Sequence, residues 1–141
     1  MPGPAPPTPA LLRQMLACDL AQVHPVARAA RKFLQEQACH AEEIVDIELA
    51  LVEACNNAIK YARPDRRHKQ VLVEARCDRD MVELRISDHT PGFDWPEQLR
   101  LPQQEAESGR GLFLIRAVMD EIHYERGGEG NTLVLRKKRA P

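Results

Sequence analysis

The sequence lacks an excess of charge of either sign, a long apolar run and any closely paired cysteines. Its formal net charge of -1 and pI near 6.5 give no reason to expect nonspecific binding to nucleic acid or to an anionic membrane surface. No apolar run approaches the length of a transmembrane helix, so we expect a soluble cytoplasmic protein. The four cysteines lie far apart, unlike those of a zinc site, and we expect reduced, buried thiols at Cys18, Cys39, Cys55 and Cys77.

The length and composition of the chain favour a single globular domain. With 141 residues, of which 43% are hydrophobic and 29% charged, the chain can bury one core but not two. Proline recurs through the first ten residues, where it fixes the backbone and removes hydrogen-bond donors. We therefore expect residues 1–10 to form a disordered tail and residues 11–141 to form the domain.

The alternation of apolar and polar residues predicts three helices and five strands. In order, these are a strand at 12–20, helices at 23–38 and 44–62, a hairpin of strands at 71–76 and 82–86, a helix opening at 108–111, and strands at 122–125 and 132–136. Asp19 is the expected cap of the first helix. Residues 95–108 are rich in polar side chains and proline, which favours a loop or lid. This order is typical of an α+β two-layer sandwich, with a mostly antiparallel sheet covered on one face by three helices.

Glu53 and Asn57 are polar residues on the helix predicted at 44–62. Their spacing of four residues places them one above the other on the same face, outside the apolar arc that would pack on the sheet. An asparagine carbonyl oxygen suits Mg²⁺, and a carboxylate one turn away can orient or deprotonate a hydroxyl group. For this pair alone, two side chains on a solvated surface remain the commoner explanation.

A second group of residues, 88–93, follows the hairpin directly. Asp88 can accept a hydrogen bond from the exocyclic amine of adenine, and Gly92 lets the backbone approach a flat ring closely. A tight turn with aspartate at its first position explains the same residues equally well.

A third group, residues 108–112, opens the last predicted helix. Gly109, Arg110 and Gly111 form a flexible loop at a helix start, where backbone amides and the helix dipole favour an anion. Arg110 adds a cation suited to phosphate. Two glycines at this spacing are a weak signal, and a simple helix-entry turn stays possible.

The order and separation of the three groups resemble those of the GHKL ATPases with the Bergerat fold, and in particular the small anti-sigma-factor serine kinases. The resemblance covers about residues 11–136. Glu53 to Ala58, followed by Tyr61 and Ala62, is similar to the N-box of that family, residues 88–94 to its first glycine box and residues 109–121 to its second.

This resemblance implies specific roles for the matching residues. Asn57 would be the Mg²⁺ ligand, Glu53 the base that activates a serine hydroxyl, and Asp88 the contact to the adenine amine. Gly92 would line the base pocket, and the phosphates of ATP would be wrapped by Gly109, Arg110 and Gly111. The chain departs from the family at Thr90, where glycine is usual and a β-branched residue narrows the approach to the nucleotide.

The resemblance further implies a protein serine/threonine kinase that uses Mg²⁺ and ATP. It would phosphorylate a STAS-domain antagonist, sequester a sigma factor or another output protein, and form a homodimer. Two other functions remain open. One is an ATP-binding regulatory module that binds partners without phosphotransfer, and the other is a scaffold that binds no nucleotide.

Overall fold

The computed structural model describes residues 9–62, 64–89, 107–127 and 130–141. Three helices and five strands occur within these ranges. They are β1 (Ala10–Leu16), α1 (Val23–Glu36), α2 (Ala41–Lys60), β2 (Val71–Cys77), β3 (Met81–Asp88), α3 (Glu107–Val118), β4 (Glu121–Arg126) and β5 (Asn131–Lys138). Two short 3-10 turns, η1 (Leu20–Gln22) and η2 (Pro64–Arg66), lie between them.

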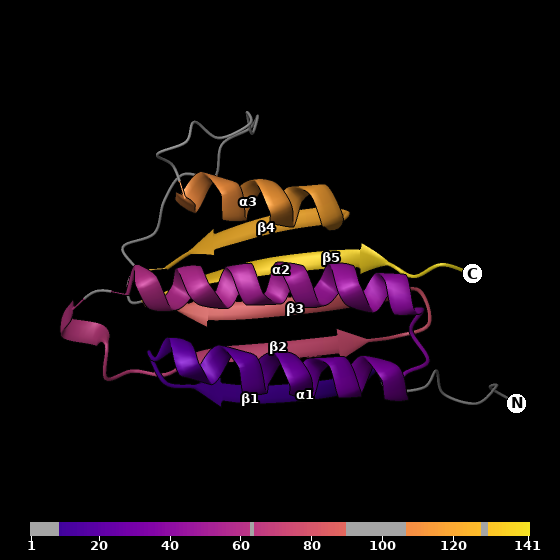
Figure 1. Ribbon diagram of the computed structural model, residues 1–141, viewed down its shortest axis with the longest axis horizontal. Coiled ribbons are helices and arrows are strands. Elements are labelled where there is room, and N and C mark those ends of the chain that lie inside the picture. The colour runs from indigo at the N-terminus through magenta and orange to yellow at the C-terminus, as the bar shows by residue number, and fades with distance from the viewer. Residues whose placement is uncertain (1–8, 63, 90–106, 128–129) are drawn as a thin grey trace, which may run out of the picture.

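The strands form one sheet in the order β1-β2-β3-β5-β4, and every neighbouring pair is antiparallel. Figure 1 shows α1, α2 and α3 side by side on one face of this sheet, with α2 in the middle. The predicted α+β two-layer sandwich is thus confirmed. Neighbouring helices run antiparallel, so α1 and α3 point the same way and α2 points the opposite way (Figure 1). A short connection joins α1 to α2, whereas the β2–β3 hairpin lies between α2 and α3 in the chain.

The predicted hairpin of β2 and β3 forms the centre of the sheet. Its inward-facing side chains are nearly inaccessible to solvent, and its outward-facing ones are polar or partly exposed. The inward row consists of Val71, Val73, Ala75, Val82, Leu84 and Ile86. Burying a large aliphatic side chain of this kind contributes roughly 1.5–3 kcal/mol, so this row and the apolar arc of α2 hold the two layers together.

The central helix α2 begins three residues earlier than the sequence predicted. The carboxylate of Glu43 accepts a hydrogen bond from the backbone nitrogen of His40 at 3.1 Å, which caps the helix. Its second oxygen accepts one from the backbone nitrogen of Ala140 at 2.8 Å. The acidic residues predicted as a connection therefore belong to the first turn of α2, and one of them also fixes the C-terminal end of the chain.

Three other predictions for the N-terminal part of the chain were wrong: two element ends and one helix cap. The first strand ends at Leu16 instead of residue 20, because the chain turns into η1. Asp19 caps that 3-10 turn through the backbone nitrogen of Ala21, at 3.0 Å, and does not cap α1 directly. The helix α1 ends at Glu36, two residues before the predicted end.

Residue Ala38 ends α1 in a left-handed conformation, with φ of 58°. Its nitrogen donates to the carbonyl of Gln35 at 3.0 Å, and the nitrogen of Cys39 donates to the carbonyl of Leu34 at 3.1 Å. These two bonds are the pattern of a Schellman motif, whose left-handed position is usually glycine. An alanine there carries backbone strain of about 1–2 kcal/mol.

We predict that Ala38→Gly stabilises the protein. Glycine removes the strain but gains entropy in the unfolded chain, so the net gain is about 0.5–1 kcal/mol, or a melting temperature about 2–4 °C higher. Thermal unfolding monitored by circular dichroism measures it. The matched control is Ala29→Gly inside α1, which should lower the melting temperature because it removes helix propensity of about 1 kcal/mol. Equal destabilisation by both substitutions would contradict the strain.

Candidate functional site

The backbone of α3 lies close to side chains of α2 at Gly111. A Cβ atom placed on Gly111 would lie 2.9 Å from Oε2 of Glu53 and 3.5 Å from Nδ2 of Asn57. Residues from two groups that the sequence singled out separately, Glu53 with Asn57 and the group at 108–112, therefore meet at one point. The lack of a side chain at Gly111 is what allows the backbone of α3 to lie against both polar groups.

Glu53 and Asn57 lie at the edge of the buried arc of α2. Their neighbours Ala54 and Ala58 are buried against the sheet, whereas Glu53 and Asn57 are half-buried on the side that faces α3. The helical spacing of four residues explains why both reach the same neighbour. The two side chains thus line the junction of two helices and do not project from a fully solvated face.

Asp88 is the last residue of β3 and continues the inward-facing row of that strand. It is only 8% exposed, and its Oδ1 accepts a hydrogen bond from Nδ2 of Asn131 at 3.3 Å. The antiparallel register places these two residues opposite each other. A buried carboxylate needs such a donor, since desolvation without a partner is costly.

The residues at the start of β5 lie against the end of β3. A Cβ atom on Gly130 would lie 2.6 Å from the carbonyl oxygen of Asp88 and 3.4 Å from Nδ1 of His89. The sequence placed Gly130 and Asn131 between the strands predicted at 122–125 and 132–136, and their contact with Asp88 was not predicted. The available signal was the strand register, which pairs the start of β5 with the end of β3.

These residues gather at one end of the molecule. In Figure 1 the C-terminal part of α2, the end of β3 and the start of α3 lie at the same side. Asp88 faces the helix layer, as the alternation along β3 requires. The arrangement offers a half-buried carboxylate, a carboxamide, a glycine backbone and the N-terminal turn of a helix, which together suit a hard cation bound to phosphate.

The remaining predicted site residues are placed only in part. Gly92, Thr90 and most of the predicted lid lie outside the described residues. Gly109 and Arg110 belong to α3, which begins at Glu107, so the predicted loop is already helical there. The first turn of a helix has backbone amides without partners inside that helix. The start of α3 should therefore still favour an anion, as predicted.

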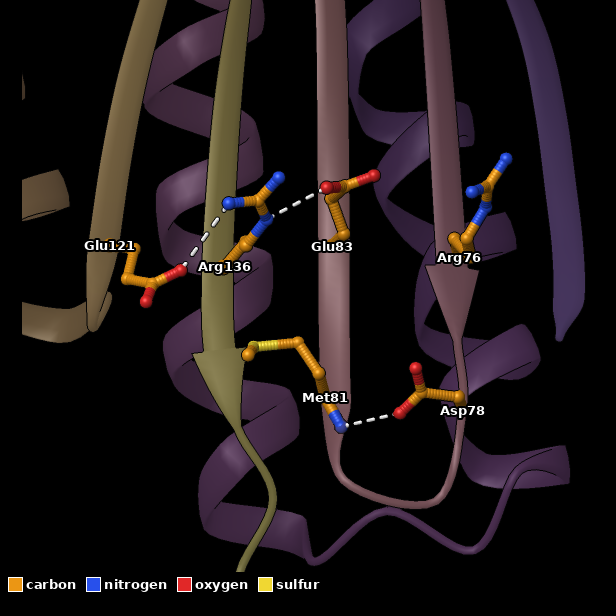
Figure 2. Close-up of a pocket in the computed structure, with 6 residues that line it drawn as sticks. All are labelled: Arg76, Asp78, Met81, Glu83, Glu121 and Arg136. Atoms are coloured by element: carbon orange, nitrogen blue, oxygen red, sulfur yellow. Dashed lines mark hydrogen bonds and ion pairs between the residues drawn. The ribbon is translucent and has the colours of Figure 1, made fainter.

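A hollow of about 320 Å³ lies on the face of the sheet away from the helices (Figure 2). It is lined by Arg76, Asp78, Met81, Glu83, Glu121 and Arg136. Arg136 joins the two carboxylates beside it: its Nε donates to Glu83 at 2.8 Å and its Nη1 to Glu121 at 3.5 Å. Figure 2 shows these pairs lying flat across neighbouring strands.

The charges in this hollow are mutually satisfied around Glu83. Desolvation opposes ionisation of Glu83, but hydrogen bonds from Arg136 and Arg85 outweigh it, so the pKa of Glu83 lies below its ordinary value. Cross-strand pairs such as Glu83–Arg136 stabilise a sheet surface. Because no helix start or glycine backbone contributes to it, we place the candidate site between α2 and α3.

No helix in the described ranges combines the length and hydrophobicity needed to span a membrane.

We predict that Gly111→Ala moves the carboxylate of Glu53 without unfolding the protein. The new methyl group would lie within 3 Å of Oε2 of Glu53, and that flexible side chain is the part that yields. Alanine also favours the helix by about 1 kcal/mol, so the melting temperature should stay the same or rise. A crystal structure of the variant and thermal unfolding measure both effects. Ala117→Gly, on the exposed face of α3, is the control: it should lower stability and leave Glu53 in place. A well-folded Gly111→Ala with an unmoved Glu53 would contradict the close approach.

The whole sandwich has counterparts among known proteins. The family model described as "Histidine kinase-like ATPase domain" matches residues 16–137. The chain is 30% identical over 103 residues to an anti-sigma F factor of Clostridium perfringens, covering 69% of this chain and 74% of that protein. It is 28% identical over 105 residues to the serine-protein kinase RsbW of Bacillus velezensis, covering 68% of this chain.

The match spans 65% of the length of that kinase, which is less than two thirds. Among solved structures, the RsbU and RsbW domains of Rv1364c from Mycobacterium tuberculosis align with a TM-score of 0.72 at 21% identity. That alignment covers 94% of this chain and 33% of the other, and it concerns the fold. Since the family model covers nearly the whole of the described fold, the chain belongs to the family of histidine kinase-like ATPase domains.

Proposed function

We propose that this protein binds Mg·ATP at the junction of α2 and α3 and transfers the terminal phosphate to a serine or threonine of a partner protein. The observation that carries the proposal is the meeting of Glu53, Asn57 and Gly111. A carboxylate and a carboxamide from α2 meet the backbone near the start of α3 there, at the same end of the molecule as the buried Asp88.

Each residue has a proposed task in nucleotide binding. Asn57 would hold Mg²⁺ through its carbonyl oxygen, and Asp88 would accept a hydrogen bond from the adenine amine, with Asn131 fixing its orientation. Gly92 would line the base pocket. The phosphates would lie against the backbone of Gly109, Arg110 and Gly111 at the start of α3.

Glu53 is the proposed general base. When bound, Mg·ATP supplies the phosphoryl group and the cation that neutralises its charge. The carboxylate of Glu53 would accept the proton of the attacking hydroxyl group, and its half-buried position beneath α3 keeps it close to the expected position of the phosphates. Most of the remaining catalysis in phosphoryl transfer comes from positioning, which the rigid α2–α3 junction supports.

The partners are proposed from the relatives and from the resemblance of the motifs. A curated relative named a serine-protein kinase and another named an anti-sigma F factor support a kinase that acts on a protein and binds a sigma factor. We propose a STAS-domain antagonist as the phosphate acceptor and a sigma factor or another output protein as the sequestered partner. The protein would act in the cytoplasm as a homodimer.

A single-turnover assay with labelled Mg·ATP and candidate STAS-domain proteins tests the proposal directly. Transfer of label to the partner supports a kinase. Tight binding of ATP with no transfer to any of them would favour a regulatory module that binds nucleotide without phosphotransfer. An absence of any thermal shift with Mg·ATP would reject both.

We predict that Glu53→Gln lowers the rate of phosphate transfer by about 10²–10⁴-fold, because it removes the base but keeps the shape of the side chain. The dissociation constant for ATP should change by less than about threefold, since the amide still fits beneath α3. The control is Glu48→Gln on the same helix, which breaks only a surface pair with Arg31 and should leave transfer intact. If Glu53→Gln transfers phosphate at the normal rate, Glu53 is not the general base.

We predict that Asn57→Ala removes the part of ATP affinity that depends on Mg²⁺. Loss of a metal ligand should weaken binding in Mg²⁺ by at least about tenfold while binding in a chelator stays unchanged. Isothermal titration in both conditions measures the difference. Asn56→Ala is the matched control, because this half-buried neighbour lies about 100° away around the helix. If Mg²⁺ still tightens binding to Asn57→Ala as it does for the unchanged protein, the metal assignment is wrong.

A further inference from the structure

Two of the four thiols lie close together at the end of the molecule opposite the candidate site. The sulfur atoms of Cys39 and Cys77 are 3.9 Å apart, and the residues are 8% and 3% exposed. Cys39 lies in the connection between α1 and α2, and Cys77 is the last residue of β2. In Figure 1 this connection and the end of β2 lie at the other end of α2 from the start of α3.

The backbone holds both cysteines in position. Cys39 follows the strained Ala38 and is fixed by the hydrogen bond from its nitrogen to the carbonyl of Leu34. After Cys77 the carboxylate of Asp78 closes the hairpin turn by accepting bonds from the nitrogens of Asp80 and Met81, each at 2.8 Å. The two sulfurs therefore face each other because two separate turns converge, although the two cysteines are 38 positions apart in the chain.

A guanidinium group lies against one of the two sulfurs. Nη1 of Arg139 is 3.5 Å from the sulfur of Cys77 and 2.7 Å from the carbonyl oxygen of Asp78, and Nη2 is 2.7 Å from the carbonyl oxygen of Gln37. Arg139 thus bridges both turns. A fixed positive charge favours a thiolate beside it, so Arg139 partly offsets the burial of Cys77, and we take Cys77 as the thiol that reacts first.

We propose that Cys39 and Cys77 form an oxidation site, which closes to a reversible disulfide when the protein meets a hydroperoxide. A disulfide requires a sulfur separation of about 2 Å, so the atoms must approach by about 2 Å from their present 3.9 Å. Because both residues are nearly buried, we expect a small oxidant such as hydrogen peroxide to react with them and a bulky one such as glutathione disulfide to be excluded. The inference does not depend on the proposed kinase activity.

The oxidation proceeds in two balanced steps. The Cys77 thiolate attacks one oxygen of hydrogen peroxide, the O–O bond breaks, hydroxide leaves, and Cys77 becomes a sulfenic acid. The Cys39 thiolate then attacks the sulfur of Cys77, the S–O bond breaks and a second hydroxide leaves. The two protons released by the thiols convert both hydroxides to water. Two thiols have lost two electrons, and one peroxide has become two waters.

The same surroundings set the pH dependence of the first step. Burial raises the pKa of Cys77 to about 11, the neighbouring Cys39 and Asp78 act in the same direction, and Arg139 opposes them. Below that pKa the thiolate fraction grows tenfold with each pH unit. The rate of disulfide formation should therefore rise about tenfold per unit between pH 7 and pH 10.

The test treats the folded full-length protein with hydrogen peroxide and follows it by intact and peptide mass spectrometry. We expect the loss of two hydrogens, one cross-linked peptide pair joining Cys39 and Cys77, and the tenfold rise in rate per pH unit. The bridge closes a long loop, so the melting temperature should increase by about 10 °C and return on reduction. Glutathione disulfide should leave the pair reduced.

Cysteine variants show which of the two thiols is oxidised first. Cys39→Ser should trap a sulfenic acid at Cys77, detected with dimedone added while the protein is unfolded, whereas Cys77→Ser should give none at Cys39. Cys55→Ser is the control, because this thiol is also buried and has a pKa raised by burial to about 12, and its loss should leave cross-linking unchanged. If the unchanged protein stays folded in peroxide with Cys39 and Cys77 both reduced, or if either is oxidised without pairing, the proposal fails whatever the variants do.

Discussion

The close approach of α3 to α2 is the constraint on which the candidate site depends. It exists because position 111 is glycine, which lets one helix backbone lie directly over the side chains of Glu53 and Asn57. At the other end of α3, Nζ of Lys137 donates to the carbonyl oxygen of Val118 at 2.7 Å and pairs with Asp46 of α2 at 3.3 Å. The positive charge of a lysine interacts favourably with the negative C-terminal end of the helix dipole. The helix is therefore held at both ends, and the junction is a defined site between two rigid elements.

The sheet contributes Asp88 to the site, a polar residue at a position where the pattern of β3 would place an apolar one. The inward row of β3 runs Val82, Leu84 and Ile86, and its next member is Asp88. A carboxylate in that position weakens the packing that an aliphatic side chain would provide, and it needs the amide of Asn131 to offset its desolvation. Local rules of this kind are broken mainly at functional sites. The position of Asp88, at the end of the molecule that also carries Glu53 and Asn57, follows that expectation.

Most of the fold could be predicted from the sequence, because long periodic segments report directly on their buried faces. The β2–β3 hairpin and α2 have clear periods of two and 3.6 residues, and each was found where the pattern put it. The ends were less accurate, since they depend on single hydrogen bonds. Glu43 starts α2 early, and Ala38 ends α1 with a conformation that is rare for alanine. Neither the cap at Glu43 nor the left-handed conformation of Ala38 leaves a periodic signal in the sequence.

The site was predictable only where its residues lie within one helical turn of each other. The spacing of Glu53 and Asn57 identified one face, but the contact with Gly111 joins segments more than fifty residues apart, and Asn131 lies 43 residues from Asp88. These contacts follow from strand register and helix packing, which pattern alone does not specify. Gly111 had been explained by phosphate binding, yet its position against Glu53 provides an independent reason for glycine there.

The helix α2 separates the requirements of stability from those of the site. Its 20 residues span about 30 Å, and its N-terminal end is fixed by Glu43 and lies beside the cysteine pair, whereas its C-terminal half carries Glu53 and Asn57. The apolar side chains of the buried arc pack the helix on the sheet. Polar groups at the edge of that arc contribute little to this attachment, because they displace no apolar contact with the strands. Their chemistry is therefore free to serve a ligand, and altering it reports on the site and not on the stability of the fold.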